Sequence, residues 1–87
     1  LNMLDGIEGG FDVEEFYFEQ FKDDFKELSI QELHVRSSSG ANILAVGKRH
    51  GGLQINPSPD TRLQNDWYFI VVGRKTSMEQ FREVYIK

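Results

Sequence analysis

The side chains that could do chemistry in this sequence are two histidines, a run of serines and a pair of adjacent aspartates. His34 and His50 stand alone, with no second imidazole at a helical ligand spacing and no serine or carboxylate spaced to form a triad. The serines at 37–39 lack the glycine-flanked turn that exposes a nucleophile. The sequence therefore predicts that this chain is not an enzyme.

Asp23 and Asp24 lie near Glu19 and Glu27, and clustered carboxylate oxygens attract hard divalent cations. Adjacent aspartates in a charged stretch are more often a solvated face. The expected assignment is no metal site, with Asp23 and Asp24 as the candidates if one exists.

Composition narrows the class of protein further. The 87 residues, of which 39% are hydrophobic, are enough for one small globular domain. No apolar run approaches the roughly 18 residues of a membrane span. The sequence has no cysteine, which excludes disulfides and thiolate zinc sites and fits a cytoplasmic setting.

The net charge of −4 is unevenly distributed. Residues 1–33 hold ten acidic and two basic side chains, whereas residues 34–87 hold four acidic and eight basic ones. The two halves can attract one another within or between subunits, or simply face water. Because the whole chain is acidic and its basic half diffuse, we expect no nucleic-acid partner.

The first third of the chain has few clear elements to position these groups. Residues 1–10 contain three glycines and no sustained periodicity, as in a linker or a helix tail. From Phe11 the pattern fits a strand with Phe16 and Phe18 on one face. It fits equally a helix with Phe18, Phe21, Phe25 and Leu28 at helical spacing.

The middle third reads more clearly. Ser29 begins a short helix to Leu33, because Glu32 completes the capping-box spacing. Residues 37–40 break the chain. Residues 42–49 then form a strand, and the Gly51-Gly52 turn leads back into a second strand over 53–55.

The last third begins with a corner over 56–60, since its two prolines cannot continue a central strand. Asn65 is expected to take the left-handed conformation in a turn over 64–66. Residues 67–72 are apolar on both faces, which predicts a central buried strand. Ser77 is expected to cap a helix through Lys87, with Met78, Phe81, Arg82 and Tyr85 along one face.

This order of elements and its residues resemble the TrkA-C domain, the C-terminal domain of RCK proteins that regulate bacterial and archaeal potassium channels and transporters. The resemblance covers about residues 12–84. Its strongest parts are the proline corner from Ile55 to Thr61 and the stretch from Asp66 to Gly73. Glu27 and Asn65 depart from the family, each standing where it usually has glycine.

The resemblance implies an α+β fold: a small β-X-β-β-X-β-α domain, with a mixed sheet or pseudo-barrel capped by a C-terminal helix. It favours a strand over residues 13–20. It also implies that residues 1–10 are a linker from a preceding domain and that residues 11–87 are the TrkA-C-like regulatory domain.

Family members of the Ktr type bind cyclic di-AMP in a cleft between two C-terminal domains. If this chain binds the ligand in the same way, Arg49 would pair with a phosphate and Asn56 would form a hydrogen bond with the edge of a base. Ile55 and Pro57 would then pack on the faces of the base. The same residues can instead serve only the fold. The positions that match the family's ligand site are Ile43, Leu44, Arg49, Ile55, Asn56 and Pro57.

The resemblance thus predicts a cytoplasmic regulatory domain of a potassium channel or uptake system, controlling cation transport allosterically. It would form a homodimer and sit at the inner face of the cell membrane through the membrane-embedded part of its parent protein. No GxGxxG is present, so we expect no cofactor here beyond cyclic di-AMP or another small regulatory ligand. The alternative is a structural dimerisation module, without a ligand, appended to an antiporter or anion symporter.

Overall fold

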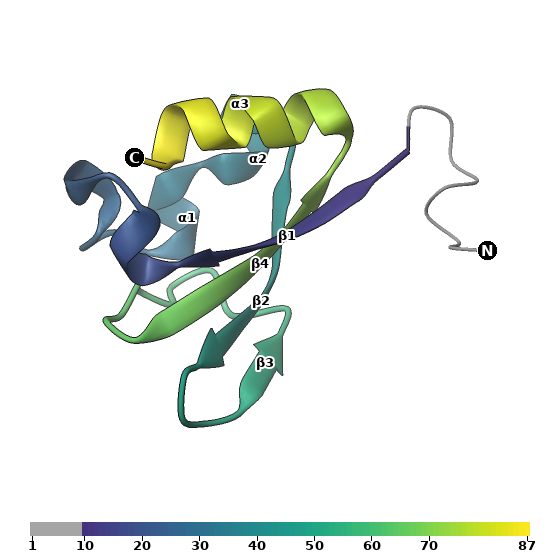
Figure 1. Cartoon of the computed structure of the whole chain (residues 1–87). Helices are drawn as coiled ribbons and strands as arrows, with labels where there is room; N and C mark the ends of the chain where they lie inside the picture. The colour runs from purple at the N-terminus through teal and green to yellow at the C-terminus, as the bar shows by residue number, and fades with distance from the viewer. Residues whose placement is uncertain (1–9) are drawn as a thin grey trace.

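The computed structural model describes residues 10–87, which form one four-stranded sheet with the helices packed on one side (Figure 1). The prediction for residues 1–10 lies outside the described residues except for Gly10. The strands are β1 (Asp12–Tyr17), β2 (Asn42–Lys48), β3 (Leu53–Ile55) and β4 (Trp67–Gly73). The helices are the 3-10 turns η2 (Phe18–Gln20) and η3 (Asp23–Phe25), then α1 (Ile30–Leu33), α2 (Val35–Ser39) and α3 (Lys75–Tyr85).

The sheet has the strand order β1-β4-β2-β3, and every neighbouring pair is antiparallel. The α+β class and the β-X-β-β-X-β-α order are confirmed, with an antiparallel sheet in place of a mixed one. Strand β4 pairs with both β1 and β2, as its run of apolar residues predicted.

The two faces of the sheet differ because side chains alternate along each strand. Phe69 and Val71 of β4 face the helices and belong to the same buried cluster as Leu33, Phe81 and Tyr85. We call the opposite side the open face. By the register of the strands it carries Val13, Tyr17, Leu53, Ile55, Tyr68, Ile70 and Val72.

The first strand is shorter than the predicted 13–20, because the chain turns at Phe18. The side chain of Gln20 accepts a hydrogen bond from the Tyr17 N–H at 2.7 Å, and the Phe21 N–H donates to the Phe18 carbonyl at 3.1 Å. These bonds close η2, so Phe18 and Phe21 leave the strand. The sequence supported a strand and a helix equally here, and each takes part of the segment.

Helix α1 begins at the predicted capping box. The Ser29 hydroxyl accepts from the Glu32 N–H at 3.1 Å, and the Glu32 carboxylate accepts from the Ser29 N–H at 2.9 Å. The predicted break at 37–40 is wrong at residues 37–39, because these three serines form the end of α2. Ser39 stays in the helix by donating to the Val35 carbonyl at 2.6 Å. The helix ends only at Gly40, whose φ of 83° suits glycine.

Two further local predictions need correction. The left-handed residue in the turn before β4 is Asp66, with a φ of 68°, rather than Asn65. Helix α3 is not capped by Ser77 and does not reach Lys87: it runs from Lys75 to Tyr85, with Arg74 at the N-cap position and no side-chain cap. It stops at Tyr85 because Ile86 pairs with Phe21 as an isolated bridge and the Lys87 N–H donates to the Gln20 carbonyl at 2.8 Å.

The core lies between the sheet and helices α1 to α3, and aromatic rings fill much of it. Phe16 and Phe21 both contact Phe81, with ring centroids 5.0 and 6.1 Å apart. Tyr85 is 1% exposed, and its hydroxyl donates to the Leu33 carbonyl at 2.5 Å. Among the described residues, none of the helices has the length and apolarity to cross a membrane.

Candidate functional site

The β2–β3 hairpin and the proline corner bring most of the predicted ligand-binding residues together. A bulge between Ile43 and Ala45 displaces Leu44 outward from β2. Asn56 follows β3 with a φ of 52°, and its N–H donates to the Leu44 carbonyl at 2.9 Å. Ile43, Leu44 and Asn56 are therefore neighbours, and Pro57 follows at once.

Ile43 and Ile55 lie on opposite faces of the sheet. Ile43 pairs with Val71 and packs against the buried core, whereas Ile55 pairs with Ala45 and points to the open face. Ile55 is 63% exposed, and Leu53 and Leu44 are also exposed. The hairpin therefore presents aliphatic side chains to solvent.

Arg49 is separated from this group. It lies five residues beyond Leu44, roughly 16 Å along an extended strand. Its guanidinium pairs with Glu19 at 2.8 Å and lies 4.9 Å from the centre of the Tyr17 ring. The hydrogen bond with Glu19 raises the pKa of Arg49, and Glu19 has a lowered pKa through its own backbone and Arg49. Arg49 thus already has an anionic and an aromatic partner.

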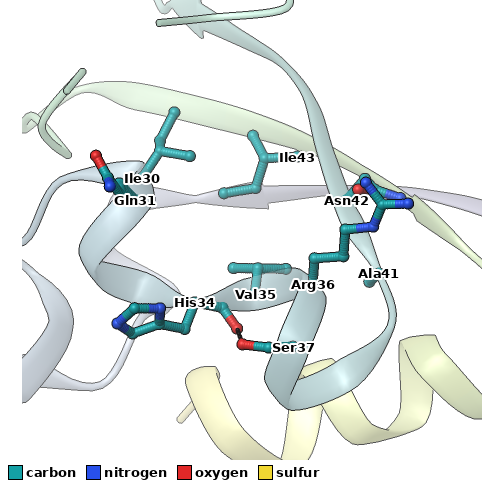
Figure 2. A pocket seen from close by; sticks show the side chains of 9 residues that line it. All are labelled: Ile30, Gln31, His34, Val35, Arg36, Ser37, Ala41, Asn42 and Ile43. Carbon is teal, nitrogen blue, oxygen red and sulfur yellow. Dashed lines mark hydrogen bonds between the residues drawn. The ribbon is translucent and has the colours of Figure 1, made fainter. Parts of the chain in front are cut away.

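A hollow of about 420 Å³ lies between α1, α2 and the start of β2 (Figure 2). Its apolar lining comes from Ile30, Val35, Ala41 and Ile43. Its polar rim comes from Gln31, His34, Arg36, Ser37 and Asn42. Of the residues predicted to bind ligand, only Ile43 lines it.

The rim is built around His34, which separates α1 from α2. His34 has a φ of 53°, a conformation seldom adopted by residues other than glycine. Its carbonyl accepts from the Ser37 hydroxyl at 3.2 Å, the bond drawn in Figure 2. Arg36 is exposed and makes no ion pair with the residues that the structure describes. Arg36 was not among the predicted site residues, because α2 itself was not predicted.

The hollow and the proline corner are held as one unit. The Ile30 N–H donates to the Thr61 carbonyl at 2.8 Å, and the Gln31 N–H donates to the Pro59 carbonyl at 2.9 Å. These bonds fix the start of α1 to the corner that follows β3. Ile43 connects the two on the other side, since it lines the hollow beside Leu44, to which Asn56 is bonded.

Two of the carboxylates in the candidate cation cluster, Asp23 and Glu19, are already paired with basic side chains. Asp23 lies 3.2 Å from Lys26 and 3.5 Å from Lys87, and a hydrogen bond from Lys26 and the charge of Lys87 lower its pKa. Glu19 is bound to Arg49. Within residues 10–87 no three metal-ligating side chains come together.

Ion pairs also join the acidic and basic halves of the sequence within one chain. Besides the pairs of Glu19 and Asp23, Glu14 pairs with Arg82, and Glu32 lies 3.4 Å from Arg62. The charge asymmetry of the sequence is thus partly neutralised inside the subunit.

Comparison with known proteins identifies this arrangement. The sequence profile of the TrkA-C domain matches residues 25–85, and a search of curated proteins finds no match. Among solved structures, the GsuK channel bound to NAD is 22% identical with a TM-score of 0.72. The match covers 88% of this chain but only 14% of that one.

Two isolated RCK C domains bound to cyclic di-AMP are also similar. That of the potassium transport protein KtrA is 25% identical with a TM-score of 0.69, covering 84% of this chain and 81% of that one. The RCK C domain dimer of BusR from S. agalactiae is 21% identical with a TM-score of 0.67, and the match covers 82% of this chain and 91% of that one.

The expectation that such a domain has no nucleic-acid partner is wrong. A structure of S. agalactiae BusR in complex with its promoter DNA matches 82% of this chain, at 21% identity and a TM-score of 0.67. The match covers 34% of that chain. The expectation rested on the net charge of one domain, which does not determine what a longer polypeptide binds.

The profile match extends over more than half of the chain and includes the proline corner, β4 and the hollow. The folds agree over 82–88% of its residues. The chain therefore belongs to the TrkA-C domain family.

Proposed function

We propose that this chain is a ligand-sensing regulatory domain that dimerises and biases the gate of a potassium channel or potassium uptake system. The observation that carries this proposal is the β2–β3 hairpin, where exposed Leu44, Leu53 and Ile55 adjoin the proline corner. A small domain gains little by exposing three aliphatic side chains together, and such patches usually meet a partner. A second copy of the domain is the partner proposed here.

The ligand would act by shifting an equilibrium between two arrangements of the dimer. A ligand held between two subunits changes their geometry only as far as its affinity for the two arrangements differs. Cyclic di-AMP is the ligand class proposed, because it is bound by the similar KtrA domain. The domain itself would carry out no reaction and would lie in the cytoplasm, attached to the membrane through its parent protein.

A second candidate function is the effector domain of a DNA-bound regulator. The similarity to BusR in complex with its promoter DNA favours it. Dimer geometry and ligand binding would serve both functions in the same way, and only the protein to which the domain is joined would differ.

Sedimentation and thermal melting of the chain, with and without cyclic di-AMP, test the proposal. We expect a dimer and a melting temperature that rises with ligand concentration, because binding stabilises the native state. NAD, the ligand in the GsuK structure, is the matched comparison. A monomer whose melting temperature is unchanged by millimolar cyclic di-AMP contradicts the proposal. A dimer whose melting temperature is unchanged favours the alternative, a structural dimerisation module without a ligand.

A further inference from the structure

We propose that the hollow between α1, α2 and the start of β2 is the docking site of this chain's own N-terminal segment, residues 1–9. The hollow is apolar inside and basic at its rim, whereas the segment is apolar and acidic. The inference goes beyond the proposed function and does not depend on the regulatory ligand or on the dimer.

The lining of the hollow determines what it can accept. The side chains of Ile30, Val35 and Ile43 point into its space, which measures about 420 Å³ (Figure 2). His34 and Arg36 lie at the rim, and none of the described residues that line the hollow is acidic. An occupant that carries aliphatic side chains beside negative charges therefore matches the hollow.

Residues 1–9 have this composition. The segment contains no basic residue. Its apolar side chains can leave water in the hollow, and its carboxylates can approach the guanidinium of Arg36 at the rim. The apolar members are Leu1, Met3, Leu4 and Ile7, and the acidic ones are Asp5 and Glu8.

The described chain begins within reach of the hollow. Asp12 and Asn42 both pair with β4, at Gly73 and Val72, so one strand separates them and they lie about 10 Å apart. Asn42 lines the hollow, and it also lines a second hollow of about 310 Å³ together with Phe11. Nine extended residues can span roughly 30 Å, which is more than this distance.

Covalent attachment favours this occupant over a separate molecule. Gly10 has a φ of 63°, so the backbone turns immediately before β1. A segment tethered this close has an effective concentration at the hollow in the millimolar range. Contacts that would be too weak to hold a free peptide are then sufficient, which is why we assign the hollow to the segment of the same chain.

A paramagnetic label on the segment tests the assignment in the whole chain. Because the sequence has no cysteine, Asn2→Cys provides a single attachment point. In methyl-labelled protein we expect the signals of Val35 and Ile43 to lose at least half of their intensity relative to the reduced label. The signals of Leu53 and Ile55, which lie on the hairpin, should keep most of theirs.

Variants of the two partners show whether the apolar and charged contacts are responsible. In the labelled protein, Arg36→Gln should restore at least part of the lost intensity, whereas Arg49→Gln, on the distant hairpin turn, should not. In the unlabelled protein, Ile7→Asp should shift the methyl signals of the hollow. Asn2→Asp is its control, because it adds the same charge at a polar position of the segment and should leave those signals nearly unchanged. Circular dichroism checks that each variant folds.

Mixing labelled chains that carry no methyl isotope with unlabelled, methyl-labelled chains distinguishes the chain's own segment from that of a second copy. We expect no loss of intensity in this mixture. Loss that appears in the mixture, loss that is greater at Ile55 than at Ile43, or no loss at any methyl group overturns the inference. The proposed function is tested separately by cyclic di-AMP binding and dimerisation, so the two can fail independently.

Discussion

Gly47 illustrates how much a single residue decides on the open face. An ideal Cβ built on Gly47 would lie 2.2 Å from Cζ of Tyr68, which is its partner on β4. The ring of Tyr68 is in turn 6.0 Å from that of Tyr17 on β1. The absence of a side chain at Gly47 therefore lets the Tyr68 ring lie flat across β2.

We predict that Gly47→Ala lowers the free energy of unfolding by about 1–3 kcal/mol, because the ring must move or the strands must separate. Gly52→Ala is the control, since nothing lies within 4 Å of the added carbon, and its effect should stay within about 0.5 kcal/mol. Urea denaturation measures both. In a Tyr68→Ala background the cost of Gly47→Ala should largely vanish. Equal costs in both backgrounds would contradict the steric account.

Which residues could be foreseen depends on how far apart their partners lie in the sequence. Ser29 and Glu32 are three residues apart, so their capping box was predicted and is present. Arg49 finds Glu19 thirty residues away, and no local pattern reveals that pairing. The sequence therefore indicated positions that match the family's ligand-site motif without revealing that Arg49 already pairs with Glu19.

At the scale of elements, α1 depends on its cap because the helix has only four residues. The buried Ser29 and the carboxylate of Glu32 satisfy each other's backbone N–H groups. Hydrogen bonds with Ser29 also hold the pKa of Glu32 below its ordinary value of 4.5. The cap thus fixes the element that forms one wall of the hollow.

We predict that Ser29→Ala destabilises the domain by about 1 kcal/mol, as the loss of an N-cap usually does. Ser37→Ala is the matched control, because Ser37 is exposed and its hydroxyl, within residues 10–87, donates only to the nearby His34 carbonyl. Denaturant unfolding measures the change in the free energy of unfolding for each variant. An NMR titration of Glu32 should find that its pKa rises in part in Ser29→Ala and not in Ser37→Ala, because the substitution removes the Ser29 hydroxyl while the Ser29 N–H still donates to the Glu32 carboxylate. Equal costs of Ser29→Ala and Ser37→Ala would contradict the role of the cap.

The prediction failed for helix α2 and for the end of helix α3, and both failures have a physical reason. Helix α2 contains three consecutive serines, and local propensity favours a break there. The helix forms because Val35 is buried in the core and because the serine hydroxyls bond the helix's own carbonyls. Helix α3 ends early because Ile86 pairs with Phe21, sixty-five residues away. The burial of Val35 and the bridge of Ile86 to Phe21 both involve residues distant in the sequence, which local propensity does not reveal.

For the whole molecule, the side chains that remain exposed are more informative than those that are buried. The described part of the chain exposes four large aliphatic side chains: Val13, Leu44, Leu53 and Ile55. Three of them belong to the β2–β3 hairpin, and the fourth lies at the opposite edge of the sheet on β1. This distribution makes the hairpin the centre of the proposed dimer and makes Val13 a control with similar exposure.

We predict that Ile55→Lys weakens the dimer at least tenfold, because a charge would replace an aliphatic contact at the centre of the interface. The fold should survive, since Ile55 is 63% exposed on an edge strand, where lysine is well tolerated. Val13→Lys, at a residue that is 53% exposed, should leave the dimer unchanged. Sedimentation equilibrium gives the dissociation constants, and circular dichroism checks the fold of each variant. If both variants weaken the dimer equally, the interface covers the whole open face. If Ile55→Lys does not weaken the dimer, the hairpin is not part of the interface.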